Sequence, residues 1–302
     1  ALGKDQSPEY DTVIIDEAAR VNPGDLMIPL SQARRRIIMV GDHRQLPHMY
    51  DEEIFEELNR EGNNVHAEDI RESMFEHLLN RAKALTKKDG IVRFVTLDNQ
   101  YRMHPDLGNF ISRNFYERYG EGFHSPLGPE NFSQILENQP MKWIDIPLSS
   151  GKMESLSYSK FRSCEVECII DEIRRYKEKM GTLPLTIGVI SFYRAQVNQI
   201  RRRLKDENLS DNVSVGTVDA FQGMEFDVIF LSIVRTGIDV NSINLDELEK
   251  DPSSIENQQE REKFVSRRDL VGRRQYGFLT SENRLCVALS RQKRLLVVVG
   301  DG

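Results

Sequence analysis

The chain has 302 residues, of which 39% are hydrophobic and 29% are charged, and its formal net charge is −7. This length suits one large or two ordinary globular domains, and the negative charge excludes a generally basic nucleic-acid coat, although not a local basic groove. Three cysteines exclude a disulfide framework and a four-ligand metal set, and without an apolar membrane span or a signal-like N-terminus we expect an intracellular protein, cytoplasmic or nuclear, with no membrane partner.

Short β-branched runs alternate with helical patterns along the chain, which is typical of an α/β protein. Several of the expected strands are continuous apolar runs, as in a parallel sheet that is buried on both faces. We expect strands at 12–16, 36–41, 93–97, 142–146, 185–191, 213–218, 227–234 and 294–300. We expect helices at 52–60, 69–84, 105–116, 163–180, 194–206 and 282–291. Cys164 and Cys168 would share one face of a helix, which favours packing over zinc binding.

Two stretches interrupt this alternation. Residues 119–140 are rich in Gly, Pro and Asn and predict a long loop. Residues 237–275 are heavily charged and predict a projecting insertion. A solvated surface insertion is the simpler interpretation. The alternative is a basic arm that contacts phosphates through Arg267, Arg268, Arg273 and Arg274.

Two carboxylates, Asp16 and Glu17, end the first predicted strand. A strand end in an open α/β sheet lies beside the ligand crevice. One carboxylate there could hold Mg²⁺, and the next could orient or deprotonate an attacking water. An isolated pair would more simply be a solvated strand end, but the next strand ends in GDHRQLP (41–47). Asp42 and Gln45 are therefore expected nearby, where Gln45 could hydrogen-bond a γ-phosphate.

Later segments add cations and an aromatic ring. DNQYRMHP (98–105) offers Tyr101 for base stacking and Arg102 as a fixed cation for a transferring phosphoryl group. A core Tyr and a surface Arg are the plainer alternatives for either residue alone. VDAFQGMEFD (218–227) places a turn between two buried strands, and VALSR (287–291) puts an arginine at a helix end before the last strand.

The order of DEAA, GDHRQLP, QYRMHP, VDAFQGMEFD and VALSR resembles superfamily 1 helicases. The closest branch is superfamily 1B, which includes the nonsense-mediated-decay helicase, senataxin and the immunoglobulin mu-binding helicase. The match runs from residue 10 to 301. It implies RecA-like parallel sheets of the P-loop NTPase type. Residues 1–104 would be the C-terminal part of RecA-like domain 1, and 105–302 would be domain 2.

The resemblance also implies an activity and catalytic roles. The parent protein would be an ATP-dependent helicase or translocase that uses ATP and Mg²⁺ and moves 5′→3′ on single-stranded DNA or RNA. Asp16 would hold Mg²⁺ and Glu17 would activate the water. Gln45 would couple the γ-phosphate to the nucleic-acid site. Arg102 and Arg291 would be arginine fingers.

The remaining implied roles concern ligand binding. Tyr101 would stack on adenine, Glu225 would bind the ribose, and Gln222 and Gly223 would shape that loop. FYRAQ (192–196) resembles a family segment near bound nucleic acid. Weaker candidates for contacting a single strand are Ser191, Tyr193, Arg194 and Thr217.

The sequence departs from the family pattern at Arg20, His48 and Ser290, where Gln, Pro and Thr are common, and Arg20 puts one coupling contact in doubt. It also contains no G-x-x-x-x-G-K-[ST], a loop that lies upstream of DEAA in this family. We therefore expect a C-terminal piece that needs the N-terminal half of its own first RecA-like domain. Without a phosphate cradle it should hydrolyse ATP negligibly by itself. The alternatives are an ATP-gated clamp or scaffold, and a nuclease, for which no motif is visible.

Overall fold

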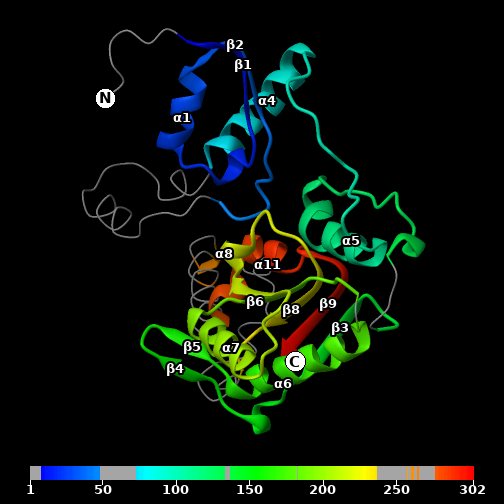
Figure 1. Cartoon of the computed structure of the whole chain (residues 1–302). Helices are drawn as coiled ribbons and strands as arrows, with labels where there is room; N and C mark the ends of the chain where they lie inside the picture. Colours follow the sequence, from blue (N-terminus) through cyan, green and yellow to red (C-terminus); the bar gives the residue numbers. More distant parts are fainter. Residues whose placement is uncertain are drawn as a thin grey trace. The chain divides into compact units, whose positions relative to one another are not determined.

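The computed structural model describes residues 8–47, 73–132, 137–181, 183–236 and 276–302, together with 257, 260, 261 and 264. The chain divides into two compact units, Ala1–Leu97 and Asp98–Gly302 (Figure 1). The helix expected at 52–60 and nearly all of the insertion expected at 237–275 lie outside the described residues.

The first unit is built on two parallel strands, β1 (Tyr10–Ile15) and β2 (Ala33–Met39). They are joined through η1 (Ala18–Arg20) and α1 (Pro23–Ser31), a helix that the sequence did not predict. A further helix, α4 (Met74–Asp89), confirms the one expected at 69–84 over its described part, and the Ser73 hydroxyl caps its start. A small core links these elements through Ile15, Ala18, Ala19, Leu26 and Phe75.

One predicted strand of the first unit is wrong. Residues 90–97 form no strand, and Val92, Val95 and Leu97 are at least 72% exposed. The run contains β-branched residues, which favour strands. No strand lies beside it in the described part of the chain, however, and the backbone N–H and C=O groups of a strand need a neighbouring strand to form hydrogen bonds. The two-stranded sheet is itself partly uncovered, because Ile14 is 67% exposed and Ile37 and Ile38 are also exposed.

The second unit contains a five-stranded sheet in the order β3-β9-β8-β6-β7. All four neighbouring pairs are parallel, which confirms the predicted fold class. The strands are β3 (Met141–Asp145), β6 (Ile187–Ser191), β7 (Val213–Thr217), β8 (Phe226–Ser232) and β9 (Gln292–Gly300). An antiparallel pair that the sequence did not predict, β4 (Glu154–Leu156) and β5 (Ser159–Phe161), lies between β3 and the next helix along the chain.

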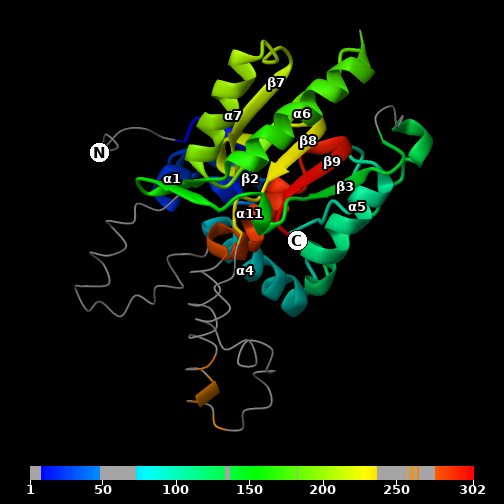
Figure 2. The ribbon, with the colours of Figure 1, turned by 90° about the horizontal axis from the view of Figure 1, so that it is seen from below.

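The helices of the second unit cover this sheet. They are α5 (Pro105–Ile111), which continues as a π-helix η2 (Ser112–Tyr116), then α6 (Ser163–Met180), α7 (Arg194–Asp206), α8 (Val218–Phe221) and α11 (Glu282–Ala288). Figure 2 shows α6 and α7 side by side along the sheet. The buried stripe of α6, Ile169, Ile170 and Ile173, packs in one cluster with buried side chains of β6, β8 and β9. Cys168 packs against the same cluster.

Short 3-10 turns complete the described elements: η3 (Glu117–Tyr119), η4 (Pro129–Asn131), η5 (Leu148–Ser150) and η8 (Gly277–Thr280). Of these, η4 lies within the loop expected at 119–140, and η3 ends where that loop begins. Among the described residues, no helix is both long and apolar enough to cross a membrane.

The parallel register separates the sheet into two edges. At the carboxyl edge Ser191 is opposite both Thr217 and Ser232, and Asp145 is opposite Gly300. At the amino edge Phe226 is opposite Gln292. Loops that follow strands and loops that precede them therefore lie at opposite ends of this unit.

A polar cluster fastens α6 to the start of β3. Arg175 Nη2 and Tyr176 Oη donate hydrogen bonds to Glu137 Oε1 over 2.5 Å and 2.7 Å, and Lys142 of β3 lies 3.4 Å from the same oxygen. Burial alone would raise the pKa of Glu137, but these hydrogen bonds and the two cations outweigh it and lower the pKa to about 2.

We expect Glu137→Gln to lower the free energy of unfolding at pH 7 by about 1–2 kcal/mol, since the half-buried cluster loses its charged acceptor. The pKa is lower in the folded state, so this contribution is present above the ordinary pKa of 4.5 and disappears as the pH falls towards 2. Urea unfolding at pH 7 and pH 3 measures the difference. Glu178→Gln, on an exposed position of α6, is the control, and equal destabilisation by both variants would contradict the prediction.

Candidate nucleotide and nucleic-acid sites

The carboxyl ends of β1 and β2 lie side by side in the first unit. The Val40 N–H donates to the Ile15 carbonyl over 2.8 Å, and the Ala18 N–H donates to the Val40 carbonyl over 2.8 Å. Gly41 packs so closely that a Cβ there would lie 2.9 Å from the backbone nitrogen of Ala19. The segments DEAA and GDHRQLP therefore meet, as the sequence predicted for two neighbouring strands.

Asp16 and Glu17 are both exposed at this junction. Glu17 adopts a left-handed conformation with φ 52°, and its N–H donates to Asp16 Oδ1 over 2.9 Å. A non-glycine residue in this region is uncommon and occurs often at functional turns. The turn therefore presents two adjacent carboxylates at the end of a strand.

Oxygen ligands of this kind fit Mg²⁺, which usually keeps several waters and binds through one or two carboxylates plus substrate phosphates. Within the described ranges there is no group of three or more His, Cys, Asp or Glu side chains that could hold a metal by themselves. Asp16 thus fits an ion that is shared with a nucleotide rather than one enclosed by the protein.

Gln45 is oriented by Asp42. The Gln45 side-chain amide donates to Asp42 Oδ2 over 2.8 Å, while Asp42 Oδ1 accepts from the Arg44 N–H over 2.9 Å. The sequence placed both residues near the strand end but did not reveal this contact. Asp42 thus fixes the orientation of the Gln45 side-chain amide at the junction.

Three charged side chains meet at the amino edge of the five-stranded sheet. Arg102 Nε lies 3.1 Å from Glu225 Oε2, and Lys293 Nζ lies 2.6 Å from Glu225 Oε1. The hydrogen bond from Lys293, followed by that from Arg102, lowers the pKa of Glu225. Tyr101 beside them is 61% exposed. The sequence singled out Arg102 and Glu225 separately but did not predict that they pair. The approach of Lys293 to Glu225 follows from the parallel pairing of β8 with β9.

Gln222 and Gly223 form the turn between α8 and β8. Gly223 has φ 78°, the left-handed conformation that glycine adopts without penalty. This confirms a tight turn at QG. The turn leads directly into Glu225, so the two predicted binding elements belong to one loop at the amino edge.

Arg291 lies at the same edge but is only 2% exposed. Its Nε donates to the Val287 carbonyl over 3.1 Å and its Nη2 donates to Ser290 Oγ over 2.7 Å. The guanidinium thus binds the end of its own helix. Ser290 keeps the hydroxyl that the more common Thr would provide.

The four nucleic-acid candidates lie at the carboxyl edge, and the structure gives them different exposures. Ser191 is fully buried and Tyr193 is 5% exposed, whereas Arg194 is exposed and Thr217 is half-buried. The Tyr193 hydroxyl accepts a hydrogen bond from Arg235 Nε over 2.6 Å. The sequence did not predict a role for Arg235, although this residue lies shortly after the end of β8 at the same edge.

Comparison with known proteins identifies relatives over nearly the whole chain. A family model described as an AAA domain matches residues 70–302, and a second model of the same description matches 3–52. Helicase sen1 of Schizosaccharomyces pombe is 27% identical over 98% of the chain, and the ATP-dependent helicase NAM7 of Saccharomyces cerevisiae is 27% identical over 97%. An uncharacterized ATP-dependent helicase, MJ0104, of Methanocaldococcus jannaschii is 25% identical over 97%.

These matches cover only 15%, 25% and 36% of the three relatives, respectively. The chain therefore corresponds to a part of each. Because one model matches more than half of the chain and the named relatives agree, the chain belongs to the AAA-domain superfamily 1 helicases, in the Upf1/Sen1-like group.

Proposed function

We propose that the protein containing this chain is an ATP-dependent helicase or translocase that acts on single-stranded DNA or RNA. The described first unit would belong to the C-terminal part of RecA-like domain 1, and the second unit would be RecA-like domain 2. The observation that carries the proposal is the Arg102–Glu225–Lys293 cluster, because it joins two motifs that are 123 residues apart at one edge of one sheet.

The residues at the strand ends of the first unit support ATP hydrolysis as a part of this function. Asp16 would be a ligand of Mg²⁺, which would neutralise charge on the nucleotide phosphates when bound. Glu17 would accept a proton from the attacking water. The Gln45 amide, held by Asp42, would hydrogen-bond the γ-phosphate or that water.

The amino edge of the second unit supports nucleotide binding. Tyr101 would stack on the base through its exposed ring, and Glu225 would accept hydrogen bonds from the ribose hydroxyls. Arg102 would leave Glu225 to stabilise charge on the phosphoryl group, and Lys293 would remain as the partner of Glu225. Nucleotide binding would thus break the Arg102–Glu225 ion pair, and each of these two residues would contact the nucleotide instead.

Exposed apolar side chains of the two-stranded sheet support a further part of the proposal. Ile14, Ile37, Ile38 and Val40 are all at least 40% exposed, and Ile37 and Ile38 belong to opposite faces of the sheet, whereas strands of an α/β protein are normally covered on both faces. We infer that the N-terminal half of the first RecA-like domain, which would carry the phosphate-binding loop, packs against this sheet.

An ATP-gated nucleic-acid clamp without unwinding is the second candidate. The observation that favours it is the burial of Arg291, whose guanidinium binds Val287 and Ser290. A protein that only binds ATP would not need that arginine at the phosphates.

The first prediction concerns the general base. In the protein at its full encoded length, we expect ATP hydrolysis to be stimulated by single-stranded DNA or RNA, and Glu17→Gln to lower kcat by about 100-fold or more while nucleotide still binds. Phosphate release, titrated with each nucleic acid, measures this. Glu9→Gln, an exposed position before β1, is the control. Tight ATP binding without hydrolysis by the wild-type protein would favour the clamp.

The second prediction concerns Arg102. Arg102→Gln should reduce kcat by about 1000-fold, as expected for loss of an arginine that stabilises transferring phosphate. Arg93→Gln removes an exposed arginine that is paired with Asp89 and should leave kcat unchanged. Steady-state hydrolysis at saturating ATP compares the two variants, and a similar loss in both would refute the assignment.

The third prediction concerns the chain alone. The 302-residue chain should bind and hydrolyse ATP negligibly, because its sequence contains no phosphate-binding loop. Isothermal titration with ATP and Mg²⁺, followed by an assay of phosphate release, tests this. Rapid hydrolysis by the purified chain would contradict the prediction.

A further inference from the structure

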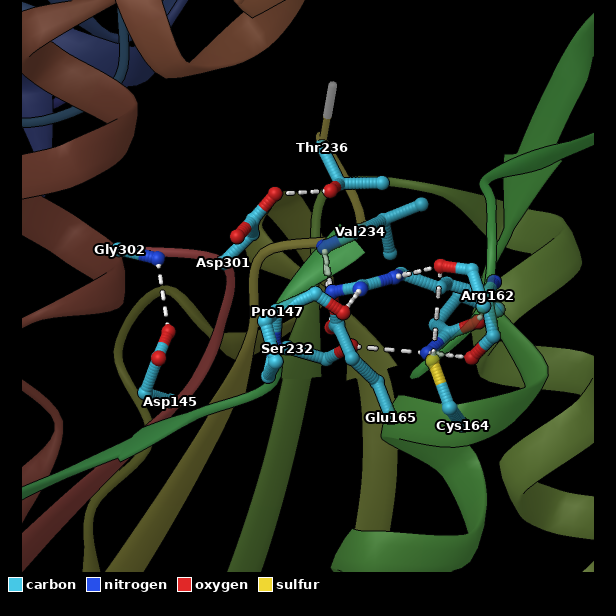
Figure 3. Close-up of polar contacts among 12 residues, drawn as sticks. Asp145, Pro147, Arg162, Cys164, Glu165, Ser232, Val234, Thr236, Asp301 and Gly302 are labelled. Atoms are coloured by element: carbon cyan, nitrogen blue, oxygen red, sulfur yellow. Dashed lines mark hydrogen bonds and ion pairs between the residues drawn. The ribbon is translucent and has the colours of Figure 1, made fainter. Parts of the chain in front are cut away.

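A fully buried ion pair joins α6 to the segment that precedes it. Arg162 and Glu165 are both 0% exposed, and Arg162 Nη1 lies 3.3 Å from Glu165 Oε1 (Figure 3). Such a pair is stable only if its remaining polar groups are also satisfied. Arg162 donates from Nε to the Gly151 carbonyl over 2.9 Å and from Nη2 to the Pro147 carbonyl over 2.8 Å. The arginine is therefore fixed by the loop between β3 and β4.

Glu165 uses its carboxylate to hold the end of β8. Ser232 Oγ donates to Glu165 Oε2 over 2.7 Å, and the Val234 N–H lies 3.0 Å from both carboxylate oxygens. Gln196 of α7 donates to the same Ser232 hydroxyl over 2.9 Å and accepts from the Arg162 N–H over 2.9 Å. One buried network thus connects α6, α7 and β8 at the carboxyl edge of the sheet.

The residue that this carboxylate holds has an unusual backbone. Val234 has φ 68° and is fully buried. A β-branched residue in the left-handed region is a genuine outlier, and such residues persist only where their surroundings impose the conformation. The two contacts to Glu165 are the observed constraint on the Val234 N–H. The Arg235 N–H also donates to the Ile233 carbonyl over 2.8 Å, so Glu165 and this local hydrogen bond together hold the turn in which the chain leaves β8.

The chain then continues into Arg235, which packs on aromatic rings. Its Nε donates to Tyr193 Oη over 2.6 Å, and its guanidinium carbon lies 5.5 Å from the Tyr193 ring centroid. The Tyr193 and Phe278 rings are 5.7 Å apart, and Phe278 is 45% exposed. We call Tyr193, Arg235 and Phe278 the edge cluster.

Gly277 allows the edge cluster to assemble. It has φ 57°, and a Cβ at this position would collide with the Arg235 guanidinium and the Tyr193 hydroxyl. The backbone of η8 therefore packs directly against the Arg235–Tyr193 contact. The position of Arg235 is thus determined from two sides, by the turn at Val234 and by Gly277.

We propose that Arg235 and Phe278 contact a bound single strand, and that Glu165 is a positioning residue that acts through Arg235 by imposing the turn at Val234. This inference rests on the proposed function. Guanidinium groups bind phosphates with directed hydrogen bonds, and exposed aromatic rings stack on bases without sequence preference. The cluster lies at the carboxyl edge of a parallel sheet, where ligands of such folds usually bind.

The direct contacts are tested in the protein at its full encoded length with fluorescently labelled oligo(dT) and oligo(U). Arg235→Gln and Phe278→Leu should each weaken binding about 10-fold. Arg235→Gln alone should also reduce the slope of log K against log salt by about one, as expected for one lost phosphate contact. As binding weakens, the concentration of single-stranded nucleic acid that gives half-maximal stimulation of ATP hydrolysis should rise, whereas the maximal rate should stay the same. Unchanged binding by Arg235→Gln would overturn the proposal.

The positioning role is tested by a double-mutant cycle. Glu165→Gln should weaken strand binding as much as Arg235→Gln, and the double variant should lose no more than either single variant, because both act through one contact. Glu167→Gln changes an exposed residue of the same helix and should leave binding unchanged. If Glu165→Gln does not fold, Ser232→Ala removes one of the hydrogen bonds to the carboxylate and replaces it in the cycle. Additive losses would overturn the positioning role.

A pair of glycine variants tests whether displacing Arg235, with its charge retained, weakens the binding of single-stranded nucleic acid. Gly277→Ala and Gly181→Ala each place a Cβ on a residue with positive φ, 57° and 56°, but only the Cβ at 277 meets the edge cluster. Gly277→Ala should therefore weaken strand binding, and Gly181→Ala should not. Equal effects would overturn the proposal. A wild-type protein that binds no strand would overturn the proposed function itself, whereas normal binding by the wild type and by every variant would overturn this inference alone.

Discussion

The parallel alignment of the five-stranded sheet is the constraint on which the rest of the second unit depends. Since all strands run the same way, every loop that follows a strand lies at one edge and every loop that precedes a strand lies at the other. Glu225 and Lys293 consequently meet at the amino edge, where Arg102 pairs with Glu225, and Tyr193 and Arg235 meet at the carboxyl edge. The proposed nucleotide site and the proposed single-strand site thus lie at opposite edges of one sheet.

Buried polar contacts then connect the covering helices to the sheet. α6 takes part in two of them, one at Glu137 near the start of β3 and one at Glu165 near the end of β8. Further polar contacts join the strand ends themselves, since Thr236 donates to Asp301 and the Gly302 N–H donates to Asp145 Oδ1 over 3.0 Å (Figure 3). In these contacts the loops at both ends of the sheet are held by groups from elsewhere in the chain.

The two units differ in how completely their sheets are covered. The five-stranded sheet has buried side chains on its central strands, such as Val189, Val228 and Val297, whereas Ile14 and Ile38 of the two-stranded sheet are exposed. The packing of another part of a RecA-like domain against the two-stranded sheet, as proposed above, would account for this difference. Asp16, Glu17 and Gln45, the residues for which a phosphate ligand is proposed, lie at the strand ends of this same sheet.

The sequence by itself determined the strands of the parallel sheet, the helices at 163–180 and 194–206, and the motifs that identify the family, because periodicity and motif order are local properties. It failed at 93–97, where a β-branched run has no neighbouring strand in the described part of the chain, and it missed α1 and the β4–β5 pair. Only the tertiary structure decided that Arg102 pairs with Glu225, that Arg291 and Ser191 are buried, and that Glu165 holds Val234 in a left-handed turn. These features depend on contacts between residues far apart in the sequence, and no local pattern encodes which distant groups will meet.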